Sequence, residues 1–170
     1  MKTPRRKAPA AADRWTVGAL MTEQPVTIGR NESLSTAHRM MGEHRVRHLP
    51  VLDHGELVGI VTQRDLYLIE SIRGVDIDDD VVDDAMSTDV YAVLPDAAIA
   101  QVAKHMMRNR YGCAVVMERE RVVGIFTVTD ALRLVAAVVP LPSHPVAVSK
   151  RAAKARPSTA RRSPAASSSI

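Results

Sequence analysis

The chain contains an internal repeat. The stretch from Gly59 to Asp65 returns 65 residues later, from Gly124 to Asp130, with Gly, Ile, Thr and Asp at the same places. The two copies align without a gap from residue 17 to residue 130. Repetition constrains the fold strongly, because each copy must form the same unit and must bury its apolar face against a neighbour.

Each copy reads as a short helical turn and strand, then a helix, two strands joined by a turn, and a closing helix. In the first helix, Leu34, Ala37 and Met41 follow the i, i+3, i+7 spacing of an amphipathic helix. Asp96 is expected to cap the matching helix of the second copy. The predicted elements are 17–21, 26–28, 33–44, 48–52, 57–61 and 64–73, and then 81–86, 90–94, 96–109, 113–117, 122–126 and 129–139.

This order predicts an α/β (α+β) fold of two β-α-β-β-α repeats packed sheet to sheet. A single copy of about 55 residues would be marginal alone, whereas two copies can share a core. The predicted organisation is a basic tail at 1–14, repeat 1 at 15–74, repeat 2 at 75–139, and a Pro/Ala/Ser/Lys/Arg-rich tail at 140–170. Both tails are expected to be disordered because they lack apolar periodicity.

Charge divides the chain in the same way. Residues 15–149 carry 12 Lys and Arg against 18 Asp and Glu, whereas the remaining residues carry 11 basic residues and one acid. Basic low-complexity tails bind nucleic acid non-specifically. A solubilising tail without a specific partner explains the same composition, and the sequence leaves both interpretations open.

Several classes of protein are excluded by simple observations. The single cysteine, Cys113, can form neither an internal disulfide nor a zinc cluster, which favours a reduced, cytoplasmic compartment. The longest apolar run, 134–139, is far shorter than the roughly 20 residues of a membrane span. No phosphate-loop motif, metal cluster or nucleophile–base pair is present, so the chain is not expected to be an enzyme. The aspartates of 76–84 are interpreted as a solvated linker.

The repeated Thr-x-x-Asp allows two interpretations. Thr62 and Thr127 would be helix N-caps, with Asp65 and Asp130 at the third helical position. That arrangement is close to a capping box. It would equally form a ligand site, where a phosphate rests on backbone amides and the hydroxyl while the carboxylate accepts the hydroxyls of a ribose.

The repeated Gly-Ile-x-Thr-x-x-Asp, preceded in each copy by a Met-Thr/Ser turn, a helix and a hairpin, resembles the cystathionine-β-synthase (CBS) domain family. The segments 20–22, 48–53 and 58–62 are typical of it. Two copies in one chain resemble a CBS pair, also called a Bateman module. The resemblance covers residues 15–139.

The resemblance implies a regulatory module, without a catalytic cofactor, that binds AMP, ADP, ATP or S-adenosylmethionine in the cleft between repeats. One site lies on each side, and each site mixes the two copies. The Asp would take the ribose and the Thr would lie beside the ribose or phosphate. Thr127 and Asp130 would face Pro25, Val26, Arg47, His48 and Pro50, whereas Thr62 and Asp65 would face Val90, Tyr91, Arg110 and Cys113.

The second of these sites departs from the family pattern. It has Gly112-Cys113 where the first has Arg47-His48, so weaker phosphate binding is expected at Asp65 than at Asp130. Structural interpretations stay open for several of these residues. Arg47 and His48 fit a solvated helix–strand junction, Arg110 fits a helix-end partner of the dipole, and Tyr91 fits strand packing.

Three functions follow as hypotheses. The first is a stand-alone sensor of an adenosine-containing ligand that modulates an unknown protein. The second is a nucleic-acid-associated protein that binds through its tails and dimerises through its core. The third is a structural dimer with inactive sites. The closing helices carry more apolar residues than one inner face needs, which predicts a homodimer through them.

Overall fold

The computed structural model describes residues 15–139, so the predictions for both tails lie outside the described residues. The first copy forms α1 (Val17–Leu20), β1 (Thr22–Glu23), β2 (Ile28–Gly29), α2 (Leu34–His44), β3 (His48–Asp53), β4 (Glu56–Thr62) and α3 (Gln63–Glu70). The second forms α4 (Val82–Ala85), β5 (Ala92–Val93), α5 (Ile99–Asn109), β6 (Cys113–Glu118), β7 (Arg121–Thr127) and α6 (Val128–Val138). The predicted mixed α/β class is confirmed.

The strands form two sheets with matching topology. In one sheet, β2 pairs in parallel with β3, and β3 pairs antiparallel with β4. In the other, β5 pairs in parallel with β6, and β6 pairs antiparallel with β7. The register of each hairpin shifts at the same place, between Val51 and Leu52 and between Val116 and Met117. The duplication therefore extends to irregularities of the pairing.

The first segment of each copy is exchanged between the two sheets. Strand β1 comes from the first copy but pairs with β7 of the second, with Thr22 opposite Ile125. In return, Ser87 of the second copy pairs with Ile60 on β4. We call the sheet β2-β3-β4 with α2, α3 and α4 the first half, and the sheet β1-β7-β6-β5 with α1, α5 and α6 the second half.

The cores follow the same exchange. Val82 of α4 is fully buried in the core of the first half, and Val17 of α1 is fully buried in the core of the second. The glycine of the repeated motif makes room for it. A Cβ on Gly59 would lie 2.5 Å from Sδ of Met86, and a Cβ on Gly124 would overlap Met21. Glycine is therefore required where the exchanged segment crosses the strand.

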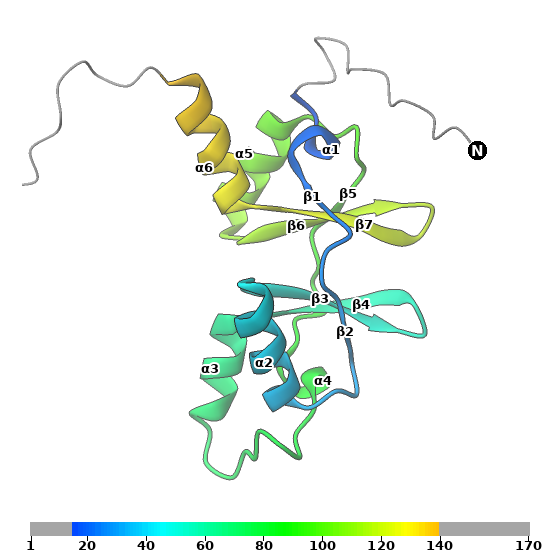
Figure 1. The fold of residues 1–170 in the computed structure, drawn as a ribbon, viewed down its shortest axis with the longest axis vertical. Helices are drawn as coiled ribbons and strands as arrows, with labels where there is room; N and C mark the ends of the chain where they lie inside the picture. The colour runs from blue at the N-terminus through cyan, green and yellow to red at the C-terminus, as the bar shows by residue number, and fades with distance from the viewer. Residues whose placement is uncertain (1–14, 140–170) are drawn as a thin grey trace, which may run out of the picture. The chain divides into compact units, whose positions relative to one another are not determined.

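The two sheets face each other and the longer helices lie beyond them, with α2 and α3 on one side and α5 and α6 on the other (Figure 1). A third apolar cluster lies between the sheets and contains Ile60, Cys113, Val115 and Ile125. The sheet-to-sheet packing expected from two marginal copies is confirmed, because each sheet buries part of its inner face against the other.

Several local predictions are wrong. Asp96 does not cap α5, because the N-cap residue is Ala98, which makes no side-chain cap bond. Its counterpart in the first copy, Ser33, does cap α2 by accepting from the amide of Thr36. The closing helix of the first copy ends at Glu70, earlier than the expected residue 73. Strands β2 and β5 each contain only two residues.

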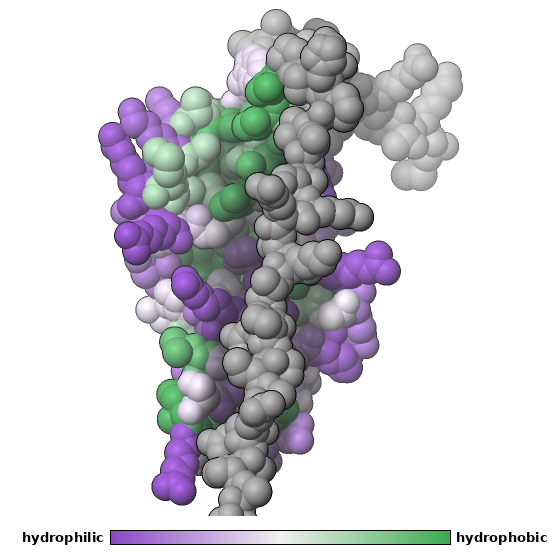
Figure 2. Space-filling model, turned by 90° about the vertical axis from the view of Figure 1, so that its left-hand side faces the viewer, coloured by the Kyte–Doolittle hydropathy of each residue, from purple (hydrophilic) through white to green (hydrophobic). Residues whose placement is uncertain are grey.

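The closing helices keep apolar side chains exposed. Leu132, Val135 and Val138 of α6 are 63%, 51% and 53% exposed, and Tyr67 and Leu68 of α3 are 58% and 66% exposed. Figure 2 faces the side of these helices and shows hydrophobic residues gathered in an upper and a lower group. The homodimer through these helices stays a prediction. Among residues 15–139, no helix has the length and apolar character to cross a membrane.

Candidate functional site

The repeated Thr-x-x-Asp forms the same hydrogen bonds in both copies. In the first, Oδ2 of Asp65 accepts from the Thr62 amide at 2.9 Å and from the Thr62 hydroxyl at 2.7 Å. The Asp65 amide donates back to that hydroxyl at 3.2 Å. In the second, Thr127 and Asp130 repeat all three bonds at 2.8, 2.7 and 3.4 Å. The capping-box interpretation is therefore confirmed in both copies.

The second carboxylate oxygen distinguishes the two copies. Oδ1 of Asp130 accepts from Nη1 of Arg133 at 2.9 Å, and the Asp130 side chain is only 6% exposed. Residue 68, one repeat before Arg133, is a leucine. Within residues 15–139, Oδ1 of Asp65 receives no hydrogen bond. Asp65 therefore keeps one oxygen open to a ligand, whereas Asp130 has both oxygens engaged.

Asp65 lines a cavity of about 560 Å³ that is built by both halves. The first half contributes the start of β3, the end of β4 and the first turn of α3. The second half contributes the segment before β5 and the junction of α5 with β6. The lining residues are Arg47, His48, Ile60, 62–65, Tyr67, Ser87, 89–91, 110–113 and Val115. Small-molecule sites fall in the range of about 300–1,000 Å³.

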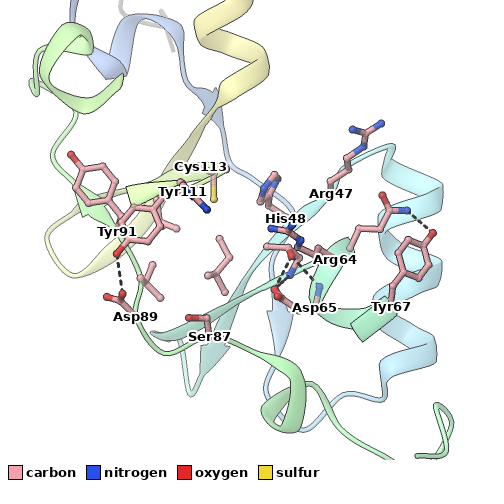
Figure 3. Close-up of a pocket in the computed structure, with 17 residues that line it drawn as sticks. Arg47, His48, Arg64, Asp65, Tyr67, Ser87, Asp89, Tyr91, Tyr111 and Cys113 are labelled. Carbon is pink, nitrogen blue, oxygen red and sulfur yellow. Dashed lines mark hydrogen bonds between the residues drawn. The ribbon is translucent and has the colours of Figure 1, made fainter. Parts of the chain in front are cut away.

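The two ends of this cavity differ in charge and chemistry (Figure 3). Arg47 and Arg64 lie at the end nearer to Asp65. At the other end, the Tyr111 hydroxyl donates to Oδ2 of Asp89 at 2.9 Å, and this bond raises the pKa of Tyr111. The ring of Tyr91 lies 5.8 Å from that of Tyr111. One end is therefore cationic and the other is aromatic and acidic.

His48 and Cys113 occupy matching positions where the two halves meet. The His48 ring lies against Gly112, where a Cβ would be 2.5 Å from Nε2. Burial lowers the pKa of His48, against the opposing effect of Asp65 and with a smaller lowering effect of Arg47. Its imidazole is therefore neutral at pH 7. Burial raises the pKa of Cys113 to about 12, so its thiol stays protonated.

The structure brings together eight of the residues selected from the sequence, because the cavity is lined by Arg47, His48, Thr62, Asp65, Val90, Tyr91, Arg110 and Cys113. Five others, including Pro25, do not line it. Thr127 and Asp130 form the second capping box, in which Arg133 pairs with Asp130. Pro50 is buried within β3, and Val26 packs against the core of the first half. Arg47 and His48 were expected to face Asp130, but they line the cavity at Asp65, where the absence of a side chain at Gly112 admits the His48 ring.

Sequence reasoning missed several lining residues. Arg64 lies inside the repeated motif but is Thr129 in the other copy, so the repeat did not single it out. Asp89 and Tyr111 are matched by Gln24 and Val46, which share neither charge nor aromaticity with them. The one available signal was position, because Asp89 immediately precedes the predicted wall residue Val90 and Tyr111 follows Arg110.

Comparison with known proteins agrees with this architecture. The family model described as CBS domain matches residues 17–69 and 81–137. A homoserine O-acetyltransferase from Methanococcoides burtonii is 36% identical over 121 residues, which cover 70% of this chain and 24% of that protein. The chain spans about a quarter of the length of the first curated relatives that it matches. The activity in that name therefore does not transfer to this chain.

Solved structures give the same result for the fold. The CBS domain pair of protein MJ0100, in complex with 5′-methylthioadenosine and S-adenosyl-L-methionine, is 28% identical with a TM-score of 0.66, covering 72% of this chain and 96% of that one. The CBS-domain containing protein ATU1752 from Agrobacterium tumefaciens is 25% identical with a TM-score of 0.65, covering 70% and 98%. The chain therefore belongs to the CBS domain family, and its two copies form a CBS pair.

Proposed function

We propose that this CBS pair is a regulatory module that binds one adenosine-containing ligand per chain, in the cavity at Asp65, and so modulates a partner protein. The observation that carries the proposal is the open Oδ1 of Asp65, which faces a cavity built by both halves. A carboxylate with one free oxygen can accept both hydroxyls of a ribose. Charge-assisted hydrogen bonds of this kind are worth about 1.5–3 kcal/mol each.

The walls around Asp65 suit the rest of a nucleoside. Ile60, Val90 and Val115 give the cavity apolar surface on which a purine ring packs, and Tyr91 adds an aromatic wall. Pockets for small ligands combine such apolar surface with a few polar groups that fix orientation. The complex of MJ0100 with two adenosine compounds supports the same ligand class for this chain.

The cations near Asp65 favour a phosphorylated ligand. Arg47 and Arg64 lie at the end nearer to Asp65, and Arg110, which directly precedes Tyr111, also lines the cavity. The positive end of the α3 dipole adds to this field, because α3 begins at Gln63, directly after Thr62. The proton of the Thr62 hydroxyl is already donated to Asp65, so Thr62 holds the carboxylate in place while the arginines bind phosphate.

Ligand binding would act on the relation between the halves. A ligand that contacts both halves stabilises the arrangement in which its contacts are made. The exposed apolar residues of α3 and α6 belong to opposite halves, and they are the surface that a second copy of the chain or a regulated protein would contact. We propose a homodimer through these helices, with the ligand biasing how the dimer presents itself to its partner.

Thermal unfolding and calorimetric titration test this proposal. We expect AMP, ADP, ATP or S-adenosylmethionine to raise the melting temperature, because a ligand at 100 times its Kd stabilises the native state by about 2.7 kcal/mol. NADH serves as a comparison ligand that contains adenosine but is larger. Titration should give a stoichiometry of one per chain. No stabilisation by any of these compounds at millimolar concentration would overturn the proposal.

A further inference from the structure

The end of the cavity that is farther from Arg47 and Arg64 contains a hydrogen-bonded pair of polar side chains, Asp89 and Tyr111 (Figure 3). Oδ2 of Asp89 accepts from the Tyr111 hydroxyl at 2.9 Å. Oδ1 of Asp89 receives no hydrogen bond within residues 15–139. The Tyr111 ring is supported in turn by Tyr91, at 5.8 Å between ring centroids, and by His105, at 5.9 Å. Asp89 is therefore held from one side and open on the other.

We propose that Asp89, positioned by Tyr111, selects a purine that carries an exocyclic amino group over one that carries a carbonyl at the same position. The inference rests on the proposed function, because it concerns the base of the nucleotide bound at Asp65. Adenine and hypoxanthine are the simplest pair of bases that Asp89 would distinguish.

The charges of the cavity set the orientation of the ligand. With the phosphate at Arg47 and Arg64 and the ribose at Asp65, the base must point toward the aromatic and acidic end. An ionised carboxylate only accepts hydrogen bonds. Oδ1 of Asp89 can therefore accept from an amino group. A carbonyl oxygen at the same place would face another acceptor and leave both without a donor.

Tyr111 determines which partner Asp89 can take. Its hydroxyl donates to Oδ2, so the carboxylate is fixed with Oδ1 as the remaining acceptor. The corresponding residues in the other copy are Gln24 and Val46. A glutamine side chain both donates and accepts, and a valine cannot orient it. Of the two corresponding positions in the copies, only the one in the cavity at Asp65 therefore has the residues for this kind of base selection.

The test compares AMP with IMP by calorimetric titration of the full chain. Asp89 is solvent-exposed, so we expect a moderate preference for AMP of at least about tenfold. Asp89→Asn keeps the size of the side chain and adds a donor. In this variant, AMP should bind more weakly and IMP more tightly, so that the preference falls to about threefold or less. Tyr111→Phe should reduce the preference by a smaller factor, because Asp89 is then free to turn.

Asp79→Asn is the matched control, since it removes an exposed acid that does not line the cavity. It should leave the preference unchanged. Equal affinity of the wild type for AMP and IMP would overturn the inference while leaving the proposed function intact. The same holds for an unchanged AMP to IMP ratio in Asp89→Asn. If AMP, IMP and adenosine all fail to bind the wild type, the proposed function fails and this inference fails with it.

Discussion

The two capping boxes, which we call the Thr62–Asp65 corner and the Thr127–Asp130 corner, have the same local structure in different surroundings. Both hold a threonine hydroxyl and an aspartate in a capping box with nearly equal distances. Only at Asp130 does an arginine take the remaining oxygen, at 2.9 Å. Only Asp65 lines the cavity described above, whereas Thr127 and Asp130 line neither it nor the smaller cavity of about 400 Å³ near α5 and α6.

This difference separates two roles that the motif combines. The capping role needs only the threonine and the aspartate, so duplication preserves it in both copies. The binding role needs an open oxygen and a suitable wall, and these depend on residues outside the motif. One such determinant is the residue three positions after the aspartate, which is Leu68 in the first copy and Arg133 in the second. The motif therefore identifies a helix start, and its neighbours decide whether that start binds a ligand.

The largest expected effect comes from replacing each aspartate by asparagine. Asp65→Asn should weaken AMP binding by at least about tenfold, because it weakens charge-assisted hydrogen bonds worth about 1.5–3 kcal/mol each. Asp130→Asn should leave affinity nearly unchanged. Calorimetric titration of both variants measures this, with melting temperatures recorded alongside. Loss of affinity in Asp130→Asn but not in Asp65→Asn would reverse the assignment of the site.

A reciprocal exchange at residues 68 and 133 should change the two corners in opposite directions. Leu68→Arg places a cation where it can pair with Asp65, as Arg133 pairs with Asp130. Arg133 is 73% exposed, so such a pair is worth at most about 1 kcal/mol. AMP affinity should therefore fall by up to about fivefold. Arg133→Leu should free Oδ1 of Asp130 without weakening binding at Asp65.

Leu68→Lys is a useful comparison for this exchange, because it adds the same charge without the planar guanidinium that fits a carboxylate. It should lower the affinity less than Leu68→Arg. Leu68 is 66% exposed, so neither variant should disturb the core. An affinity of Leu68→Arg equal to that of the wild type would show that the arginine at 133 does not explain the difference between the corners.

The last comparison concerns how His48 and Cys113 make the free energy of unfolding depend on pH. Native His48 has a pKa below its ordinary 6.5 because of burial. Below pH 6.5 the unfolded chain therefore binds a proton that native His48 does not, and the free energy of unfolding falls as pH falls. The slope from this residue is at most about 1.4 kcal/mol per pH unit.

Cys113 acts at the opposite end of the pH range. Burial raises its pKa from 9.0 to about 12, so above pH 9 the unfolded chain loses a proton that the native thiol keeps. The free energy of unfolding therefore falls as pH rises. Urea unfolding of wild type, His48→Gln and Cys113→Ala from pH 5.5 to 10 checks both signs. His48→Gln should flatten the acid side only, and Cys113→Ala the alkaline side only.

The sequence predicted the repeated order of elements and the capping boxes because those features depend on local pattern. Asp96 failed as a cap because the helix begins three residues later, after Ala98, where the second copy has lost the Ser33 of the first. The exchange of α1 and α4 was not predicted. Val17 and Val82 fit either core by their apolar character, and only the packing against the facing sheet decides between them.

The grouping of Thr62 and Asp65 with Val90, Tyr91, Arg110 and Cys113 was predicted, whereas Arg47 and His48 were assigned to the wrong site. Arg47 and His48 follow α2, its C-cap Arg45 and Val46, and the family pattern placed them opposite Asp130 of the other copy. In the structure the His48 ring extends over Gly112 and joins the cavity at Asp65. The ion pair between Arg133 and Asp130 could not be predicted from the sequence either, because an arginine at this spacing on a helix has the pattern of an ordinary surface residue.

The exchange of α1 and α4 has a consequence for how such a gene can change. A chain cut anywhere between residues 71 and 80 would separate Val82 from the core of the first half and Val17 from the core of the second half. Neither fragment would hold a complete core. The second copy is therefore indispensable even if its corner never binds a ligand. A mutation can therefore abolish ligand binding at one site of the pair, whereas deletion of a whole copy would leave the core of the remaining half incomplete.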